Sequence, residues 1–106
     1  MTVLEKEIEA KLRNTVKQNG GLCLKWVCPG WAGVPDRIVL LPGGRIIFVE
    51  LKRPDGRLSE RQKWWGRTLF RLGFEHKCIW DTDSLAVFVH WLHTDRRFDW
   101  DGDDDE

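Results

Sequence analysis

Two short apolar runs rich in isoleucine and valine, residues 37–41 and 45–51, are separated by only three residues, Pro42-Gly43-Gly44. Two such runs on either side of a Pro-Gly segment are typical of a β-hairpin. Both runs are apolar enough to be largely buried in the folded protein. The chain is therefore expected to form a sheet around this hairpin, with helices packed against it.

The length of the hairpin loop decides which side chains share a face of the sheet. If the loop consists of residues 42–44, Leu41 pairs with Arg45, and Asp36 then lies directly opposite Glu50 on the same face. A two-residue loop would shift this register by one residue and put the two acidic side chains on opposite faces. The segment begins with a proline, which favours the start of a turn, and ends with a glycine, which adopts the left-handed conformation readily. We therefore predict the three-residue loop and a facing pair of carboxylates.

Helical and strand periodicities predict the elements on either side of the hairpin. Apolar residues recur every four positions across residues 3–18, as in an amphipathic helix. Residues 22–28 are expected to form a strand. Ser59 and Gln62 match the S-x-x-Q capping box that starts a helix, and this helix should end near Gly73.

The last part of the chain predicts one more strand and one more helix. Residues 76–80 are expected to form a short strand, and Asp81 or Thr82 is positioned to cap the helix that follows. The resulting order, α-β-β-β-α-β-α, belongs to the α/β class, and its strand–helix–strand step requires a crossover. A mixed central sheet flanked by helices is therefore expected. We assign residues 1–98 to one domain and residues 99–106 to an acidic tail that is expected to be disordered.

Charge is distributed unevenly along the chain. The 17 basic and 17 acidic residues balance, but six of the acids lie in residues 99–106, which leaves residues 1–98 with six excess positive charges. Such a body suits a polyanionic partner, although a solvated surface with a solubilising tail explains the charges equally well on this ground alone. No apolar run approaches the ~20 residues that span a bilayer, so no membrane partner is expected. The three cysteines, an odd number, fit free thiols in a cytoplasm.

The informative side chains are those of Asp36, Glu50 and Lys52. Glu50 and Lys52 are two positions apart, so a strand directs both to the same face. Glu50 ends an apolar run, where a carboxylate is costly unless it is paired or bound to a metal. Two facing carboxylates repel each other unless a cation lies between them, and hard oxygen ligands suit Mg²⁺ or Mn²⁺. The alternative is a structural Glu–Lys pair with Asp36 capping a turn, and the residue types alone do not decide between the two.

At these residues the sequence resembles the PD-(D/E)XK nuclease superfamily, through Pro35-Asp36 and Glu50-Leu51-Lys52. The longer strings GVPDRIVLLPGG and IIFVELKRPDGRLSERQ more specifically resemble the virus-type replication-repair nuclease domain, VRR-NUC, and the resemblance covers residues 4–90. It implies a restriction-endonuclease-like core with the element order given above. It also implies a phage or prophage protein that works in the cytoplasm of a bacterial host.

The resemblance assigns roles to particular residues. Asp36 and Glu50 are implied to be metal ligands, with the backbone carbonyl of Leu51 as a further ligand. Lys52 is implied to be the catalytic lysine. An acidic residue on the first helix also belongs to the family site, and we choose Glu9 for this metal-binding and catalytic role.

Two of these assignments have alternatives. Glu5 lies one helical turn before Glu9 on the same face, and it is the second choice for the acidic residue of the first helix. Gln62 matches a family position near the metal and is a catalytic candidate. Its place in the capping box explains it equally well.

The expected function is that of a structure-selective DNA endonuclease, which uses Mg²⁺ or Mn²⁺ to hydrolyse phosphodiester bonds in branched or structured DNA. A homodimer would supply two active sites for paired cuts on a four-way Holliday junction. The alternatives are a flap-directed or nick-directed nuclease, a non-catalytic DNA-binding module, and a structural interaction protein. Six basic residues flank the proposed site in the sequence and are expected to grip phosphates: Lys25, Arg37, Arg53, Arg57, Arg61 and Lys63.

Overall fold

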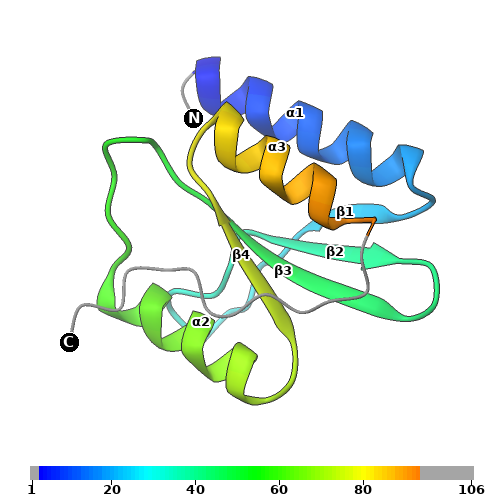
Figure 1. Cartoon of the computed structure of the whole chain (residues 1–106). Helices are drawn as coiled ribbons and strands as arrows, with labels where there is room; N and C mark the ends of the chain where they lie inside the picture. Colours follow the sequence, from blue (N-terminus) through cyan, green and yellow to red (C-terminus); the bar gives the residue numbers. More distant parts are fainter. Residues whose placement is uncertain (1–2, 94–106) are drawn as a thin grey trace.

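The computed structural model describes residues 3–93. In chain order their elements are α1 (Val3–Gln18), β1 (Leu22–Lys25), β2 (Arg37–Leu41), β3 (Arg45–Leu51), α2 (Glu60–Arg71), β4 (Glu75–Ile79) and α3 (Thr82–Trp91). This is the predicted order α-β-β-β-α-β-α, and the α/β fold class is confirmed (Figure 1). The predicted acidic tail, residues 99–106, lies outside the described residues.

The four strands form one mixed sheet in the order β1-β2-β3-β4. β1 pairs antiparallel with β2, and β2 pairs antiparallel with β3, whereas β3 and β4 run parallel. α2 is the crossover between the two parallel strands, as a strand–helix–strand order requires. The mixed central sheet predicted from the sequence is confirmed.

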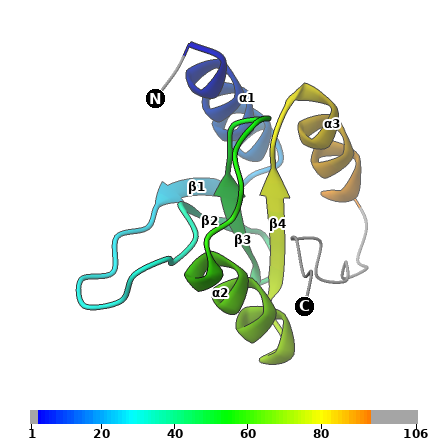
Figure 2. The ribbon, with the colours of Figure 1, turned by 90° about the vertical axis from the view of Figure 1, so that its left-hand side faces the viewer.

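Helices cover both faces of the sheet. α1 and α3 lie side by side over one face, and α2 lies over the other (Figure 1, Figure 2). The main core lies under α1 and α3, where Leu12, Phe88 and Trp91 belong to the same buried cluster as Val39 and Ile47 of the hairpin. Odd-numbered positions of β2 and β3 therefore face α1 and α3, and even-numbered positions face α2.

The hairpin has the predicted register. Leu41 pairs with Arg45, so the loop consists of residues 42–44. Both of its glycines adopt positive φ angles, 83° at Gly43 and 82° at Gly44. Glycine adopts these angles without the steric cost that a Cβ atom brings, which explains why this sequence forms the three-residue loop.

Some element ends differ from the prediction by a few residues. β1 ends at Lys25, three residues early, because the ladder continues only to the N–H of Trp26, which donates to the carbonyl of Asp36 at 2.9 Å. β4 begins one residue earlier than expected, at Glu75. Asp81, one of the two predicted caps, is the N-cap of α3. Within residues 3–93, no helix has the length and apolar character needed to cross a membrane.

Candidate active site

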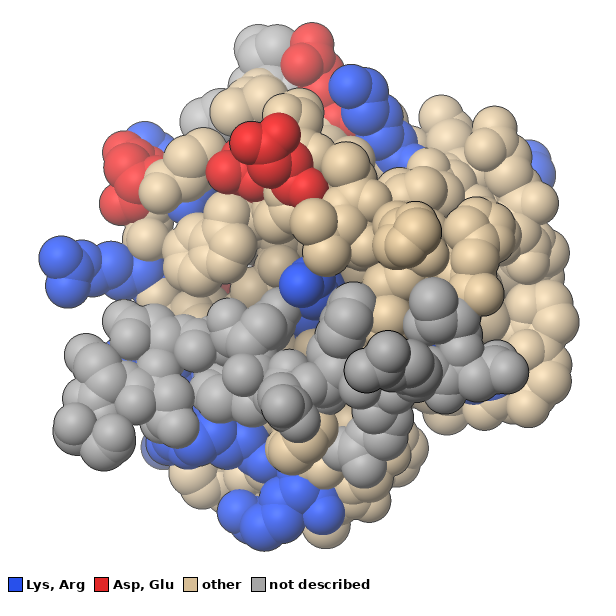
Figure 3. Space-filling model, viewed as in Figure 1, with Lys and Arg blue, Asp and Glu red and all other residues tan. Residues whose placement is uncertain are grey.

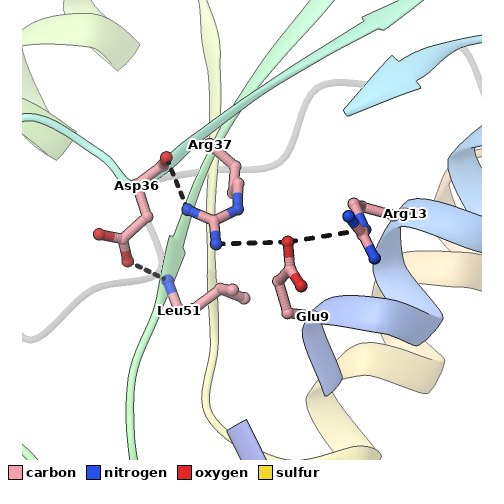
Figure 4. A network of polar contacts seen from close by, with 5 residues as sticks. All are labelled: Glu9, Arg13, Asp36, Arg37 and Leu51. Carbon is pink, nitrogen blue, oxygen red and sulfur yellow. Dashed lines mark hydrogen bonds and ion pairs between the residues drawn. The ribbon is translucent and has the colours of Figure 1, made fainter. Parts of the chain in front are cut away.

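Asp36 and Glu50 lie at one end of the sheet. Asp36 immediately precedes β2, and Glu50 is the next-to-last residue of β3. Arg37 pairs with Val49 in the hairpin. One residue further in the same register, Asp36 comes opposite Glu50. Oδ2 of Asp36 accepts a hydrogen bond from the backbone N–H of Leu51 at 3.0 Å (Figure 4). The side chain of Asp36 therefore reaches across to the strand that carries Glu50.

Glu50 is a buried acid whose pKa is raised well above its usual value. It is 3% exposed, and burial is the largest cause that raises its pKa to about 8. The charge of Asp36 and a hydrogen bond between the two carboxyl groups raise the pKa further, while the charge of Lys52 and the backbone of Asp36 partly oppose the shift. This contact between the carboxyl groups confirms that the two acids share one face of the sheet.

Gln62, on the first turn of α2, contacts the same carboxyl group. Its Nε2 donates to Oε2 of Glu50 at 2.8 Å, while its Oε1 accepts from the backbone N–H of Ser59 at 2.7 Å. The backbone N–H of Gln62 donates to Oγ of Ser59 at 3.1 Å and completes the capping box. The sequence left open whether Gln62 serves the capping box or lies at the site. Its side chain makes both contacts. Because the cap uses the amide oxygen, the amide nitrogen is directed at Glu50.

Lys52 directly follows β3 and is partly exposed. Its backbone N–H donates to the carbonyl of Ile79 at 2.9 Å, which extends the parallel β3–β4 pairing by one residue. Its ammonium group lowers the pKa of Glu50 and therefore acts on that carboxyl group from nearby. The structure thus brings together Asp36, Glu50 and Lys52, as the sequence predicted.

Glu9 belongs to a separate ion-pair network beside these carboxyl groups (Figure 4). Its Oε2 lies 3.3 Å from Nη2 of Arg37 and 3.6 Å from Nε of Arg13. Nη1 of Arg37 donates to the backbone carbonyl of Asp36 at 3.0 Å. Glu9 is therefore connected to Asp36 through the side chain of Arg37.

The expected role of Glu9 as a metal ligand stays a prediction. Among residues 3–93, no group of three or more His, Cys, Asp and Glu side chains is arranged to hold a metal ion. The carboxylate of Glu9 has arginine partners instead. Glu5, the second choice, lies one turn earlier on α1 and is partly exposed.

Two of the six residues expected to grip phosphates are buried, which corrects the prediction for them. Arg37 is 7% exposed and Lys63 is 6% exposed. Arg37 occupies an odd-numbered position of β2 that faces α1, and Lys63 lies on the buried side of α2, with Nζ 3.5 Å from Oε2 of Glu60. The remaining four are exposed: Lys25, Arg53, Arg57 and Arg61.

Comparison with known proteins relates this arrangement to a family. No family model matches the chain. Over 87 residues the chain is 44% identical to "Putative nuclease p44" of Acyrthosiphon pisum secondary endosymbiont phage 1, which covers 82% of this chain and 92% of the relative. A solved structure described as "VRR_NUC domain" superposes with a TM-score of 0.77 at 22% identity, over 84% of this chain and 97% of that one. This chain belongs to the same family as that phage protein, and its fold is that of a VRR-NUC domain.

The candidate site of this chain offers oxygen donors that fit a divalent metal ion. The carboxyl groups of Asp36 and Glu50 contact each other at a buried position, and a cation between them would relieve the repulsion that raises the pKa of Glu50. Carboxylate and carbonyl oxygens are the ligands that Mg²⁺ and Mn²⁺ prefer. Asp36, Glu50 and the carbonyl of Leu51 are therefore the residues that would hold such an ion.

The alternation of side chains along β2 already indicates that Arg37 faces the core and not the site. Arg37 shares the odd-numbered face of β2 with Val39 and Leu41, which pack in the main core. A buried arginine needs an acidic partner, and Glu9 on α1 is that partner. The alternation that directs Asp36 into the site therefore directs Arg37 away from it.

Proposed function

We propose that this VRR-NUC chain is a DNA endonuclease that requires Mg²⁺ or Mn²⁺ to hydrolyse phosphodiester bonds. The observation that carries the proposal is the contact between the carboxyl groups of Asp36 and Glu50, where Glu50 is 3% exposed and its pKa is raised to about 8. A buried carboxylate beside a second acid destabilises a fold unless a cation or a proton joins the two. The name of the phage relative supports nuclease activity.

The residues of the site have distinct roles in this proposal. When bound, the metal ion lowers the pKa of a coordinated water and neutralises charge on the phosphate. Asp36 and Glu50 would hold the ion, and the N–H of Leu51 fixes Oδ2 of Asp36. Gln62 fixes Glu50 through its Nε2. The ammonium group of Lys52 orients the attacking water or stabilises the pentacovalent transition state.

Glu9 has an indirect role in this proposal. It holds the guanidinium group of Arg37, and that group holds the backbone carbonyl of Asp36. Glu9 is therefore a positioning residue for the start of β2, in place of the metal ligand that the resemblance implied.

We further propose that the substrate is branched DNA and that a homodimer makes paired cuts, as in the resolution of a Holliday junction. An uncovered part of the sheet supports the dimer. Leu22 and Leu24 of β1 are 59% and 44% exposed on the same face of the sheet as α2, and Val27 beyond the strand is 70% exposed. Adjoining exposed apolar side chains mark interaction surfaces.

Cleavage assays test the nuclease proposal. Labelled four-way junction, flap, nicked and intact duplex DNA are incubated with Mn²⁺, Mg²⁺ or EDTA and with wild-type chain, Glu50→Gln or Lys52→Met. We expect cleavage only with metal, and a loss on the order of 100-fold in either variant. Arg71→Gln, at an exposed position in the last turn of α2, is the matched control and should cleave like wild type.

Two results would contradict this proposal. The first is cleavage in EDTA, and the second is cleavage by Glu50→Gln at the wild-type rate. Binding of every DNA without cleavage of any would instead favour a non-catalytic DNA-binding module.

A further inference from the structure

A pocket lies beside the candidate active site, between α2 and the loop that joins β1 to β2. It has a volume of about 450 Å³ and is lined by Trp31, Glu60, Arg61, Trp64 and Arg67. Pockets that bind small ligands typically have volumes of about 300–1,000 Å³. Neither tryptophan has a role in the proposed chemistry.

The pocket exposes two tryptophan rings that are held in place. Trp31 is 55% exposed and Trp64 is 42% exposed. Both contact Trp65 edge to face, with ring centroids 5.7 Å and 5.2 Å apart. Nε1 of Trp65 donates to the carbonyl of Ala32 at 3.1 Å, which attaches the loop to α2. The two exposed rings are therefore fixed by a third, and their free faces are available to a ligand.

The pocket and the active site are built from the same two segments. Gly33 lies so close to α2 that a Cβ atom there would come within 2.5 Å of the Cβ atom of Arg61. The loop then continues directly into Asp36, and Arg61 directly precedes Gln62, which donates to Glu50. A ligand in the pocket would therefore lie next to the residues that hold the metal-binding carboxyl groups.

Basic side chains accompany the two rings. Arg61 is exposed, and Arg67 lines the pocket further along the same helix. On the face of the molecule that Figure 3 shows, further Lys and Arg side chains lie over α2, and the largest acidic group lies over the start of α3. The acid in the lining, Glu60, lies 3.5 Å from Nζ of Lys63, which balances part of its charge. Aromatic rings beside basic residues are the surface that binds unpaired bases and their phosphates.

We propose that this pocket binds an unpaired nucleobase of DNA, stacked against Trp64 and Trp31, with Arg61 on an adjoining phosphate. The inference rests on the proposed function and adds a substrate class, namely DNA with unpaired nucleotides beside the bond to be cut. A base inside an intact duplex leaves its stack only at an energetic cost. The ends of flaps and the centres of junctions offer unpaired or easily unpaired bases, which accounts for a preference for branched DNA.

Binding measured without cleavage tests the pocket separately from the chemistry. Fluorescence anisotropy in EDTA gives dissociation constants for a short oligothymidylate, for the same strand with abasic sites in place of the bases, and for a blunt duplex. The wild-type chain should bind the oligothymidylate about tenfold more tightly than the abasic strand, because stacking needs the base. Trp64→Leu should lose this difference, since leucine is apolar but has no aromatic face.

Controls separate stacking from folding and from charge. Leu72→Ala changes an apolar position that is 64% exposed at the other end of α2, and it should discriminate like wild type. Arg61→Gln should weaken binding of both single strands, whereas Arg71→Gln should not. Trp31→Leu is a second test of stacking should Trp64→Leu melt at a lower temperature than wild type.

Three outcomes would overturn the inference. The first is equal binding, within about twofold, of the oligothymidylate and the abasic strand by the wild-type chain. The second is wild-type discrimination by both Trp64→Leu and Trp31→Leu. The third is a changed sedimentation coefficient in Trp64→Leu with discrimination intact, which would identify the pocket as a contact between copies of the chain. Loss of discrimination in Trp64→Leu by a protein that cuts no DNA would support the pocket and contradict the nuclease proposal.

Discussion

His76 is another buried ionisable residue, and burial shifts its pKa in the opposite direction from that of Glu50. It is 3% exposed, and burial lowers its pKa to about 4, whereas burial raises the pKa of Glu50 to about 8. In both cases the neutral form of the side chain is favoured. His76 pairs with Phe48 in the sheet, two positions before Glu50. This part of the sheet therefore disfavours charge unless a counter-ion is supplied.

Acid should destabilise the fold through His76. The unfolded chain takes up a proton on this imidazole near pH 6.5, whereas the folded chain keeps it neutral down to about pH 4. Between about pH 4 and pH 6.5 the unfolded state binds more protons than the folded state, so the free energy of unfolding decreases as the pH falls. The contribution of neutral His76 to stability is therefore complete above pH 6.5. It is lost as the pH falls through about 4, by on the order of 3 kcal/mol.

Urea unfolding at several pH values checks this prediction. The free energy of unfolding should decrease less steeply between pH 6.5 and pH 4 in His76→Gln than in wild type. The contribution of Glu50 is common to both proteins and cancels in the comparison. His90→Gln, at an exposed position of α3, is the control. Equal slopes for wild type and His76→Gln would show that His76 is protonated in the folded chain.

Among the elements, the loop of residues 42–44 and the start of α2 determine where the site lies. The loop sets the register that puts Asp36 beside Glu50, and the capping box at Ser59 directs Gln62 onto the same carboxyl group. Both could be predicted from the sequence, because turn composition and capping residues act over a few neighbouring positions. The local chemistry of these segments therefore predicted the centre of the site.

The position of α1 relative to the sheet could not be predicted in the same way. Glu5 and Glu9 share one face of α1, and periodicity does not show which of them reaches the end of β2. The rotation of α1 is set by its packing against α3 and the sheet, through residues far apart in the sequence such as Leu12 and Phe88. This packing directs Glu9 to Arg37.

Gln62 couples the start of α2 to the site, and two substitutions separate its roles. Gln62→Ala removes the donor to Glu50 and the acceptor for the backbone of Ser59, so it should lower both stability and cleavage. We expect a loss of about 1 kcal/mol in stability and of about tenfold or more in cleavage rate. Ser59→Ala removes one bond of the cap but keeps the donor to Glu50, so it should lower stability alone.

Melting temperatures and single-turnover rates with Mn²⁺ measure the two effects. Equal cleavage by Gln62→Ala and Ser59→Ala, at equal melting temperatures, would show that Gln62 serves only the cap. A normal melting temperature for Gln62→Ala with a reduced cleavage rate would show that Gln62 serves the site and adds nothing to the cap.

At the scale of the whole molecule, the two faces of the sheet differ in what they pack against and what they expose. The layer of α1 and α3 covers the main core, which includes the completely buried side chains of Leu12, Val39 and Ile47. The opposite face carries the acids of the site and is covered by α2 at β4, while β1 keeps the exposed apolar residues Leu22 and Leu24. One face therefore provides most of the stability, and the other is available for DNA and for a second copy of the chain.

The exposed apolar part of β1 should form the contact between two copies. Replacement of Leu22 and Leu24 together by threonine keeps a high strand propensity but removes the apolar surface. We expect the wild-type chain to sediment as a dimer at assay concentration and the double variant as a monomer. The variant should also nick four-way junctions without making paired cuts, because one copy supplies one active site. Val87→Thr, at a 51% exposed position of α3, is the matched control and should remain dimeric. A wild-type chain that cuts junctions in pairs while it sediments as a monomer would contradict this arrangement.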